Sequence, residues 1–128
     1  SKEIINILNQ LKPPFNVGRP ALFAASAAVK DVSWLKKEVD HINKWNKILF
    51  KNFKEMNIET NDSKTNFLLI SFNRVNINSK KVFQKLASVG ILVRKMDVYG
   101  IKNSLRITIG KSNENKKLIS VFRKIFNV

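Results

Sequence analysis

A stripe of large apolar side chains at helical spacing constrains the fold of this chain more than any other sequence feature. Its members are Leu35, Val39, Ile42, Trp45, Leu49, Phe53 and Met56. Intervals of three and four residues place these side chains on one side of an α-helix. Asp31 and Ser33 both lie just ahead of Leu35, the first member of the stripe, and either residue can cap the helix. The sequence therefore predicts one long amphipathic helix of more than about 30 Å, at about 1.5 Å per residue.

Two shorter helices are expected ahead of the long one. Apolar residues recur at helical spacing in residues 1–11, and a pair of prolines ends that pattern. Residues 13–19 contain two Pro and one Gly, which predicts a loop that reorients the chain. Residues 20–29 are rich in Ala and begin with Pro, which suits the first turn of a second helix.

The remainder of the chain alternates between strand and helix patterns. Residues 66–72 are almost continuously apolar, as in a strand covered on both faces. The further expected elements are a helix from Ser79 followed by a left-handed Gly90, strands at 91–94 and 105–109, and a last helix capped by Ser112. This order predicts an α+β fold with a small antiparallel or mixed sheet of about three strands, helices packed on one face, and a long connecting helix ahead of it.

Net charge is the unusual property of the composition. The 128 residues include 24 Lys and Arg against 9 Asp and Glu, a formal charge of +15. Such a balance is typical of proteins that bind nucleic acid or acidic membranes. The cations, however, are mostly Lys, lie dispersed among Asn residues, and form no run longer than pairs such as Lys36-Lys37. We interpret most of them as solvated helix faces, so nucleic acid is not the expected partner, although a free-standing basic binding module stays open.

Several kinds of site are excluded or disfavoured by composition. The chain has no Cys, which excludes disulfides, a thiolate nucleophile and Cys-based zinc sites. Its single histidine, His41, lies beside the apolar stripe without a second His nearby, so we expect a packing or surface role and no metal site. No apolar run is long enough to span a membrane and no signal-peptide pattern is present, which makes the cytoplasm the expected location.

Two arginines frame a possible anion site. If strands 91–94 and 105–109 pair in a hairpin-like antiparallel arrangement, Arg94 ends the first and Arg106 begins the second, so both emerge at one end of the sheet. Two guanidinium groups can hold a carboxylate or phosphate by bidentate hydrogen bonds that Lys does not reproduce. The alternative is that both arginines simply face solvent on the open face of an antiparallel sheet.

Four stretches of the chain, taken in this order, resemble one family of enzymes. They read "KPPFNVGRPALFAASAA", "TNFLLISF", "GILVRKMDVYGI" and "SLRITIGKSNEN". Together they resemble the C-terminal part of histidinol-phosphate aminotransferases, which are fold type I, class I/II, pyridoxal-phosphate-dependent enzymes. The resemblance covers essentially the whole chain.

The resemblance implies roles for both arginines. The arginine of the "LRITIG" strand, which is Arg106 here, anchors the acidic end of the substrate in the family, and Arg94 matches the arginine that assists at the phosphate. The implied reaction exchanges an amino group between a phosphorylated imidazole amino alcohol and a 2-oxo acid, in histidine biosynthesis. A transaminase of another amino acid, with Arg106 holding an α-carboxylate, is the near alternative.

The resemblance also implies that the cofactor machinery lies outside this chain. Family members are much longer, and their large domain supplies the Schiff-base lysine, the aspartate at the pyridine nitrogen and the phosphate-binding residues. Lys2 follows Ser1 as in the family's cofactor motif, but no glycine-rich stretch comes after it. We therefore expect no catalytic or cofactor-binding residue here, no bound pyridoxal phosphate, and no transaminase activity from this chain alone.

The expected organisation is that of a C-terminal fragment. Residues 1–30 would be the end of the large cofactor domain, residues 31–57 the long connecting helix, and residues 58–128 the complete small domain. The resemblance implies an obligate homodimer for the complete enzyme. Without the missing domain, apolar surface along residues 4–29 is expected to be exposed, so self-association of this chain is also expected. A further open reading is that the chain has no independent function.

Overall fold

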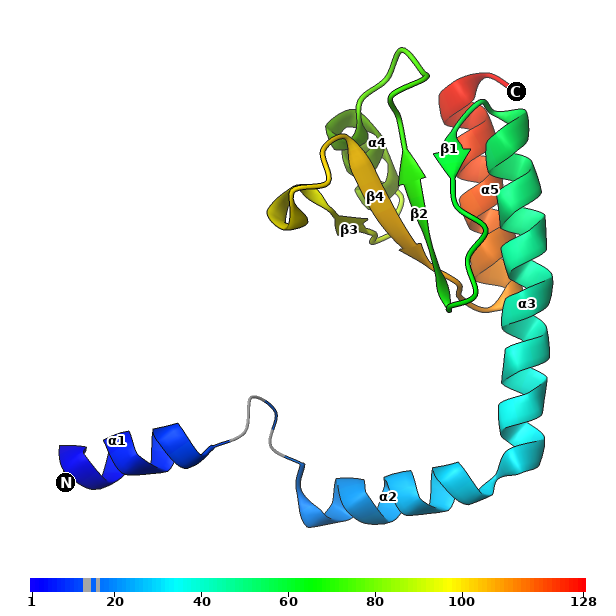
Figure 1. Ribbon diagram of the computed structural model, residues 1–128. Coiled ribbons are helices and arrows are strands. Elements are labelled where there is room, and N and C mark those ends of the chain that lie inside the picture. The colour runs from blue at the N-terminus through cyan, green and yellow to red at the C-terminus, as the bar shows by residue number, and fades with distance from the viewer. Residues whose placement is uncertain (13–14, 16) are drawn as a thin grey trace. The chain divides into compact units, whose positions relative to one another are not determined.

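The computed structural model describes residues 1–12, 15 and 17–128 (Figure 1). In chain order the elements are α1 (Lys2–Leu11), α2 (Arg19–Lys30), α3 (Val32–Glu55), β1 (Glu59–Thr60), β2 (Phe67–Ser71), α4 (Ser79–Ala87), β3 (Arg94–Lys95), the 3-10 helix η1 (Asp97–Tyr99), β4 (Ser104–Thr108) and α5 (Ser112–Phe126). Part of the predicted loop at 13–19, namely Pro13, Pro14 and Asn16, lies outside the described residues. The chain divides into two compact units, residues 1–37 and 38–128.

The first unit holds α1, α2 and the beginning of α3. None of its described residues is buried. Asp31 caps α3, because its Oδ1 accepts hydrogen bonds from the Trp34 amide at 3.0 Å and the Ser33 hydroxyl at 2.9 Å. Of the two predicted caps, Asp31 is thus the one used. These bonds, the Trp34 amide first and the Ser33 hydroxyl second, lower the pKa of the Asp31 carboxyl below its ordinary value.

The second unit is built on an antiparallel sheet with the strand order β1-β2-β4-β3. In its central pair, Leu68 lies opposite Ile107 and Ile70 lies opposite Leu105. All four of these side chains are buried. The α+β class is as predicted, but the described residues form four strands and not about three. The additional strand, β1, has only two residues, Glu59 and Thr60, and so carries no apolar alternation that a sequence reading could detect.

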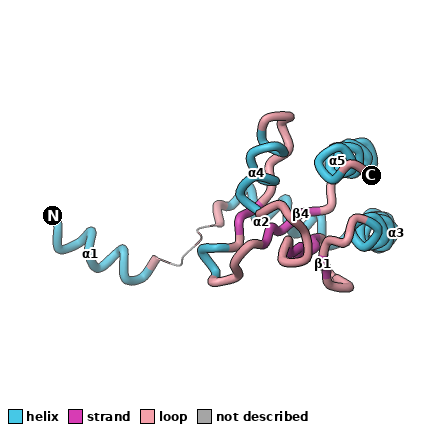
Figure 2. Tube along the Cα trace, turned by 90° about the horizontal axis from the view of Figure 1, so that it is seen from above, coloured by secondary structure: helices cyan, strands magenta, loops and turns pink. Residues whose placement is uncertain are grey.

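One hydrophobic core fills the space between this sheet and the helices of the second unit. Its buried members are Trp45, Leu49, Phe53, Met56, Ile58, Leu68, Ile70, Phe72, Val82, Leu86, Leu105, Ile107, Ile109, Leu118 and Phe122. Figures 1 and 2 show α4 and α5 behind the sheet, with α3 alongside α5. The rings of Phe53 in α3 and Phe122 in α5 meet edge to face at 5.1 Å between centroids. The helices therefore cover one face, as predicted.

The opposite face of the sheet departs from the sequence-based expectation. The apolar run at 66–72 predicts a strand covered on both faces, and this prediction is wrong for this chain. Phe67 and Leu69, which alternate with the buried residues of β2, are only half-buried. Since successive strand residues point to opposite faces and the helices occupy only one, Phe67 and Leu69 lie on the sheet's open face.

Two boundaries also differ from prediction. Strand β3 is Arg94–Lys95 and not 91–94, because the Ile91 amide bonds back to the Leu86 carbonyl at 2.9 Å and the chain pairs with β4 only after residue 93. Ser112 is the first residue of α5 rather than its cap, which is Lys111. The Ser112 hydroxyl instead accepts a hydrogen bond from the Trp45 indole at 3.2 Å. Gly90 does adopt the predicted left-handed conformation, with φ 76°.

Candidate functional site

Arg94 and Arg106 lie directly opposite each other on adjacent strands. The antiparallel pairing of β3 with β4 sets Arg94 against Arg106 and Lys95 against Leu105. Leu105 is buried against the helices, so the two arginines share the other, open face. Side chains directly opposite on a sheet start from Cβ atoms about 4.5–5.5 Å apart. The sequence placed both arginines at one end of the sheet. The structure brings them closer together, in the middle of β4 and at the start of β3.

Each guanidinium group lies over an aromatic ring. The Arg106 Cζ is 4.9 Å from the centroid of Phe67 in β2, and the Arg94 Cζ is 5.3 Å from the centroid of Tyr99 in η1. Arg94 Nη2 also donates a hydrogen bond to the Tyr99 hydroxyl. Cations are attracted to the faces of such rings, so the rings restrict where the two guanidinium groups can lie.

No carboxylate compensates this pair of cations. The ion pairs among the described residues are Lys64–Asp62, Arg74–Glu59 and Arg123–Glu55. Arg106 Nε is buried and finds no hydrogen-bond partner in the described part of the chain. Like charges directly opposite on a sheet repel, and buried polar atoms are rarely left unpaired. Two adjacent cations with a buried, unused donor therefore favour an anion from outside the chain.

Lys95, Asp97 and Tyr99 lie in or next to the connection between β3 and β4, and their surroundings differ. Lys95 points to the helix-covered face, where its Nζ lies 4.4 Å from the centroid of Phe83 in α4. Asp97 lines a small hollow with Ser79 and Lys95. A larger hollow of about 490 Å³ opens at the edge of β3, with both arginines and Thr108 in its lining. Of these three residues, Tyr99 contacts Arg94, and Lys95 also lines the larger hollow.

His41 has a structural contact. Its Nε2 lies 3.0 Å from the Gly110 carbonyl oxygen, to which it can donate a hydrogen bond. The buried Asn115 side chain bonds both the amide and the carbonyl of Gly110, at 2.9 and 2.8 Å. His41 thus ties α3 to the β4–α5 connection. In the stretches that the structure describes, no three His, Asp or Glu side chains come together as a metal site would require.

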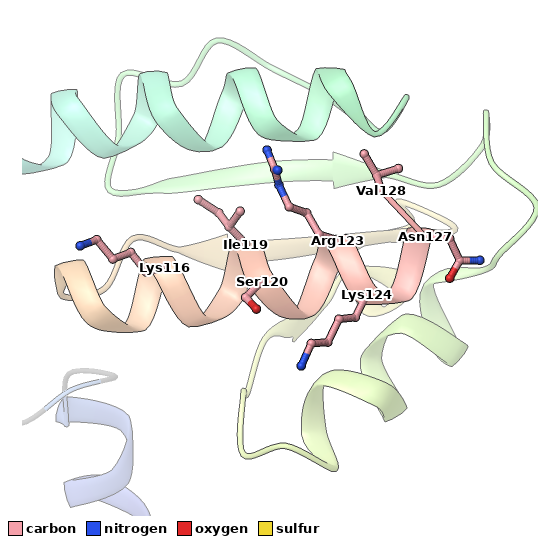
Figure 3. A pocket seen from close by; sticks show the side chains of 7 residues that line it. All are labelled: Lys116, Ile119, Ser120, Arg123, Lys124, Asn127 and Val128. Atoms are coloured by element: carbon pink, nitrogen blue, oxygen red, sulfur yellow. The ribbon is translucent and has the colours of Figure 1, made fainter.

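A wider hollow of about 730 Å³ runs along α5 (Figure 3). Lys116 and Lys124 lie at its border, and Figure 3 shows Arg123 pointing toward α3. Arg123 Nη2 bonds Asn52 Oδ1 at 3.0 Å and Glu55 Oε2 at 3.3 Å. Because that guanidinium joins two helices, it is not available to an external anion. The hollow is open and does not gather its cations as β3 and β4 do.

Neither aromatic partner of the arginines could be assigned from spacing alone. Phe67 belongs to an apolar run, and its contact with Arg106 depends on the strand register that sets Leu69 opposite Arg106. Tyr99 is five residues beyond Arg94, and only the short helix η1 turns it back. One signal was available, namely a lone Tyr between two predicted strands.

No described helix is both long and apolar enough to cross a membrane.

Solved structures define the class of protein to which this fold belongs. The histidinol-phosphate aminotransferase from Clostridium acetobutylicum matches 99% of this chain, and 39% of its own length, with a TM-score of 0.78 at 22% identity. The aspartate aminotransferase from Thermotoga maritima matches 88% of the chain, and 29% of its own length, with a TM-score of 0.67 at 10% identity. At such identities the likeness concerns the fold, which is the fold of part of an aminotransferase.

The sequence assigns the chain to a family. Residues 1–122 match the model of aminotransferase class I and II, so the chain belongs to that family. Among curated relatives, the histidinol-phosphate aminotransferase of Pelagibacter ubique (strain HTCC1062) is 40% identical over 98% of the chain, and that of Campylobacter jejuni (strain RM1221) is 42% identical over 95%. The chain spans 35% and 33% of these two relatives, about a third of their length.

Proposed function

We propose that this chain is the C-terminal part of a pyridoxal-phosphate-dependent histidinol-phosphate aminotransferase, and that it supplies the clamp for the phosphate of the substrate. The observation that carries the proposal is the uncompensated pair of Arg94 and Arg106 on the open face of the sheet. The family and the relatives' names support the proposed reaction, in which an amino group passes between histidinol phosphate and a 2-oxo acid. Binding energy at the distant phosphate then orients the reacting amine.

The proposed division of labour follows the three segments expected from the sequence. Residues 1–30 belong to the end of the cofactor domain, residues 31–57 connect, and residues 58–128 form the small domain that recognises the substrate. Exposed apolar side chains such as Leu11, Phe15 and Phe23 support the first assignment, since the remainder of a cofactor domain can cover them. The second half of the stripe, from Trp45 onward, packs into the core of the small domain.

The residues present do not fit the cofactor itself. A Schiff-base lysine is activated by desolvation or by a neighbouring cation, whereas every lysine of this chain is exposed. Lys2 lies at the beginning of α1, in a helix without a buried residue. We therefore place cofactor binding and proton transfer in the part of the polypeptide that this chain does not include, and propose that the chain alone is inactive. The proposed complete enzyme is a cytoplasmic homodimer.

A second candidate keeps the cofactor and changes the substrate. The fold shared with an aspartate aminotransferase favours no particular substrate, and Arg106 alone can hold an α-carboxylate by a bidentate contact. Arg94 discriminates between the two candidates, because a single carboxylate needs only one guanidinium group. A free-standing basic module stays the third candidate, with the lysines along α5 as its most plausible surface.

A panel of amino donors tests the proposal in the complete polypeptide that contains this chain. With 2-oxoglutarate as acceptor, kcat/KM for histidinol phosphate should exceed the values for histidinol, phenylalanine and aspartate. A preference for an aromatic or acidic amino acid would establish the second candidate instead. Absence of transamination, together with nucleic-acid binding that falls steeply with rising salt, would establish the basic module.

A further inference from the structure

Tyr99 is held over β3 by a tight turn. The helix η1 places the Tyr99 amide 3.0 Å from the Met96 carbonyl, and the Gly100 amide 2.9 Å from the Asp97 carbonyl. Gly100 adopts φ 75°, a left-handed conformation that most residues reach only with strain. The chain thereby reverses within a few residues of β3, and the Tyr99 side chain returns to Arg94.

The contact between Tyr99 and Arg94 leaves one donor free. Arg94 Nη2 donates to the Tyr99 hydroxyl oxygen, while the ring lies under the guanidinium group. A phenol is both an acceptor and a donor, so its own O–H proton is not used in this bond. No other hydrogen bond joins the Tyr99 hydroxyl to the described residues. The free O–H therefore lies next to Arg94, one of the two cations of the proposed site.

The chemistry of the two possible anions differs in the number of oxygens. A carboxylate offers two, which one guanidinium fork satisfies, whereas a phosphate monoester offers three strong acceptors and up to two negative charges. Arg94, Arg106 and the Tyr99 hydroxyl together supply donors for three oxygens. Arg94 is exposed, and without the contact to Tyr99 its long side chain would be free to leave the site.

We propose that Tyr99 is the third member of the anion site: it positions Arg94, donates its O–H to the same anion, and makes the site select a phosphate monoester over a carboxylate. This inference rests on the proposed phosphate clamp and adds the residue that determines its selectivity. Phe67 positions Arg106 by its ring alone and offers no hydrogen bond, so the two ring partners are not equivalent.

The test uses this 128-residue chain with inorganic phosphate and acetate as probes. NMR resonances of the arginine Nε–Hε groups report binding at Arg94 and Arg106 separately. Tyr99→Phe keeps the ring and removes the hydroxyl. It should weaken phosphate binding about three- to tenfold, as the loss of one hydrogen bond predicts, and change acetate binding by less than about twofold. Lys51→Gln is the charge-matched control, because Lys51 is an exposed cation on α3 and does not line the hollow that holds Arg94 and Arg106.

Each outcome bears on a different claim. An unchanged ratio of phosphate to acetate affinity in Tyr99→Phe overturns the role of Tyr99 and leaves the arginine clamp intact. Absence of any phosphate-dependent shift at Arg94 and Arg106 in the unaltered chain overturns the clamp, and the inference falls with it. Should Tyr99→Phe fail to fold, Arg94→Lys provides the second variant. It keeps the charge but not the planar fork that lies over Tyr99, and should lower the phosphate preference similarly.

Discussion

At the scale of the residue, the neighbours of Arg106 on β4 account for a cation in the middle of an apolar strand. It alternates with the buried Leu105 and Ile107, so an apolar face and a cationic face share one strand. The opposing Arg94 makes the open face less stable than a neutral pair would, because like charges directly opposite repel. An external anion would remove this repulsion, and anion binding should therefore stabilise the folded chain.

Phosphate should raise the thermal midpoint of the 128-residue chain. At ten times its Kd, a ligand that binds only the folded state contributes about 1.4 kcal/mol, or a rise in Tm of roughly 4–8 °C. Arg94→Gln should lose most of this rise, and Lys51→Gln, with the same change of charge at an exposed position on α3, should keep it. Differential scanning calorimetry makes the measurement. Equal rises in both variants would show a general salt effect and contradict a specific site.

Asp31 gives a pH-dependent prediction at the same scale. Its carboxylate accepts from the Trp34 amide and the Ser33 hydroxyl, which lower its folded-state pKa below the ordinary 3.8. The stabilisation of the start of α3 is therefore fully present above about pH 3.8 and is lost as the pH falls through the lower, folded-state value. The protection of the amides of residues 33–35, measured relative to intrinsic exchange at the same pH, should fall over that range.

A matched pair of variants separates the cap from nonspecific acid effects. Asp31→Asn retains an acceptor for the Trp34 amide and should keep the start of α3 protected at all of these pH values. Asp31→Ala should expose the Trp34 amide to rapid exchange even at pH 7. Equal protection in Asp31→Ala and the unaltered chain would show that Asp31 does not hold this helix end.

At the scale of the element, the link between β4 and α5 depends on one buried side chain. Asn115 bonds both backbone groups of Gly110, and His41 bonds the same carbonyl from α3. Asn115→Ala should lower the free energy of unfolding by about 1–3 kcal/mol, because the half-buried Gly110 amide and carbonyl lose a buried partner. Asn113→Ala, an exposed position on the same helix, should change it by no more than about 0.5 kcal/mol. Urea denaturation of both variants provides the comparison.

The elements that could be predicted are those determined by local pattern. The stripe from Leu35 to Met56 predicts α3, Asp31 or Ser33 ahead of it predicts the cap, and Gly90 predicts the turn after α4. Strand β3 could not be located, because residues 91–93 are as apolar as a strand yet follow a backbone bond from Ile91 to Leu86. Strand pairing is a long-range property, and only its register makes Arg94 and Arg106 direct neighbours.

The candidate site also combines residues that local pattern identifies with residues that only long-range pairing brings together. A cation between two core residues marks Arg106 as unusual from sequence alone, and the family resemblance suggests a role for it. The contribution of Phe67 depends on how β2 and β4 align, and that of Tyr99 on a turn with a left-handed Gly100. Such contacts join residues that are distant in the chain or reversed by a single turn, so local patterns carry little information about them.

At the scale of the whole molecule, the chain contains one stable core and a segment without one. Among the described residues, every buried hydrophobic one falls within 38–128, whereas apolar residues along 1–37, including Phe23 and Val29, are exposed. The chain spans about a third of the curated relatives that it matches. Substrate recognition and cofactor chemistry are therefore proposed to reside in different parts of one larger enzyme.

The most direct test of this account compares histidinol phosphate with histidinol as amino donors for the complete polypeptide. The ratio of their kcat/KM values should favour the phosphorylated donor strongly, and Arg94→Gln should reduce that ratio about 10- to 100-fold, the loss expected for a charged hydrogen-bonded contact. Lys51→Gln, at an exposed position on α3, should leave the ratio unchanged. If Arg94→Gln and Lys51→Gln give the same ratio as the unaltered enzyme, the arginine pair is not the phosphate clamp and the central claim is wrong.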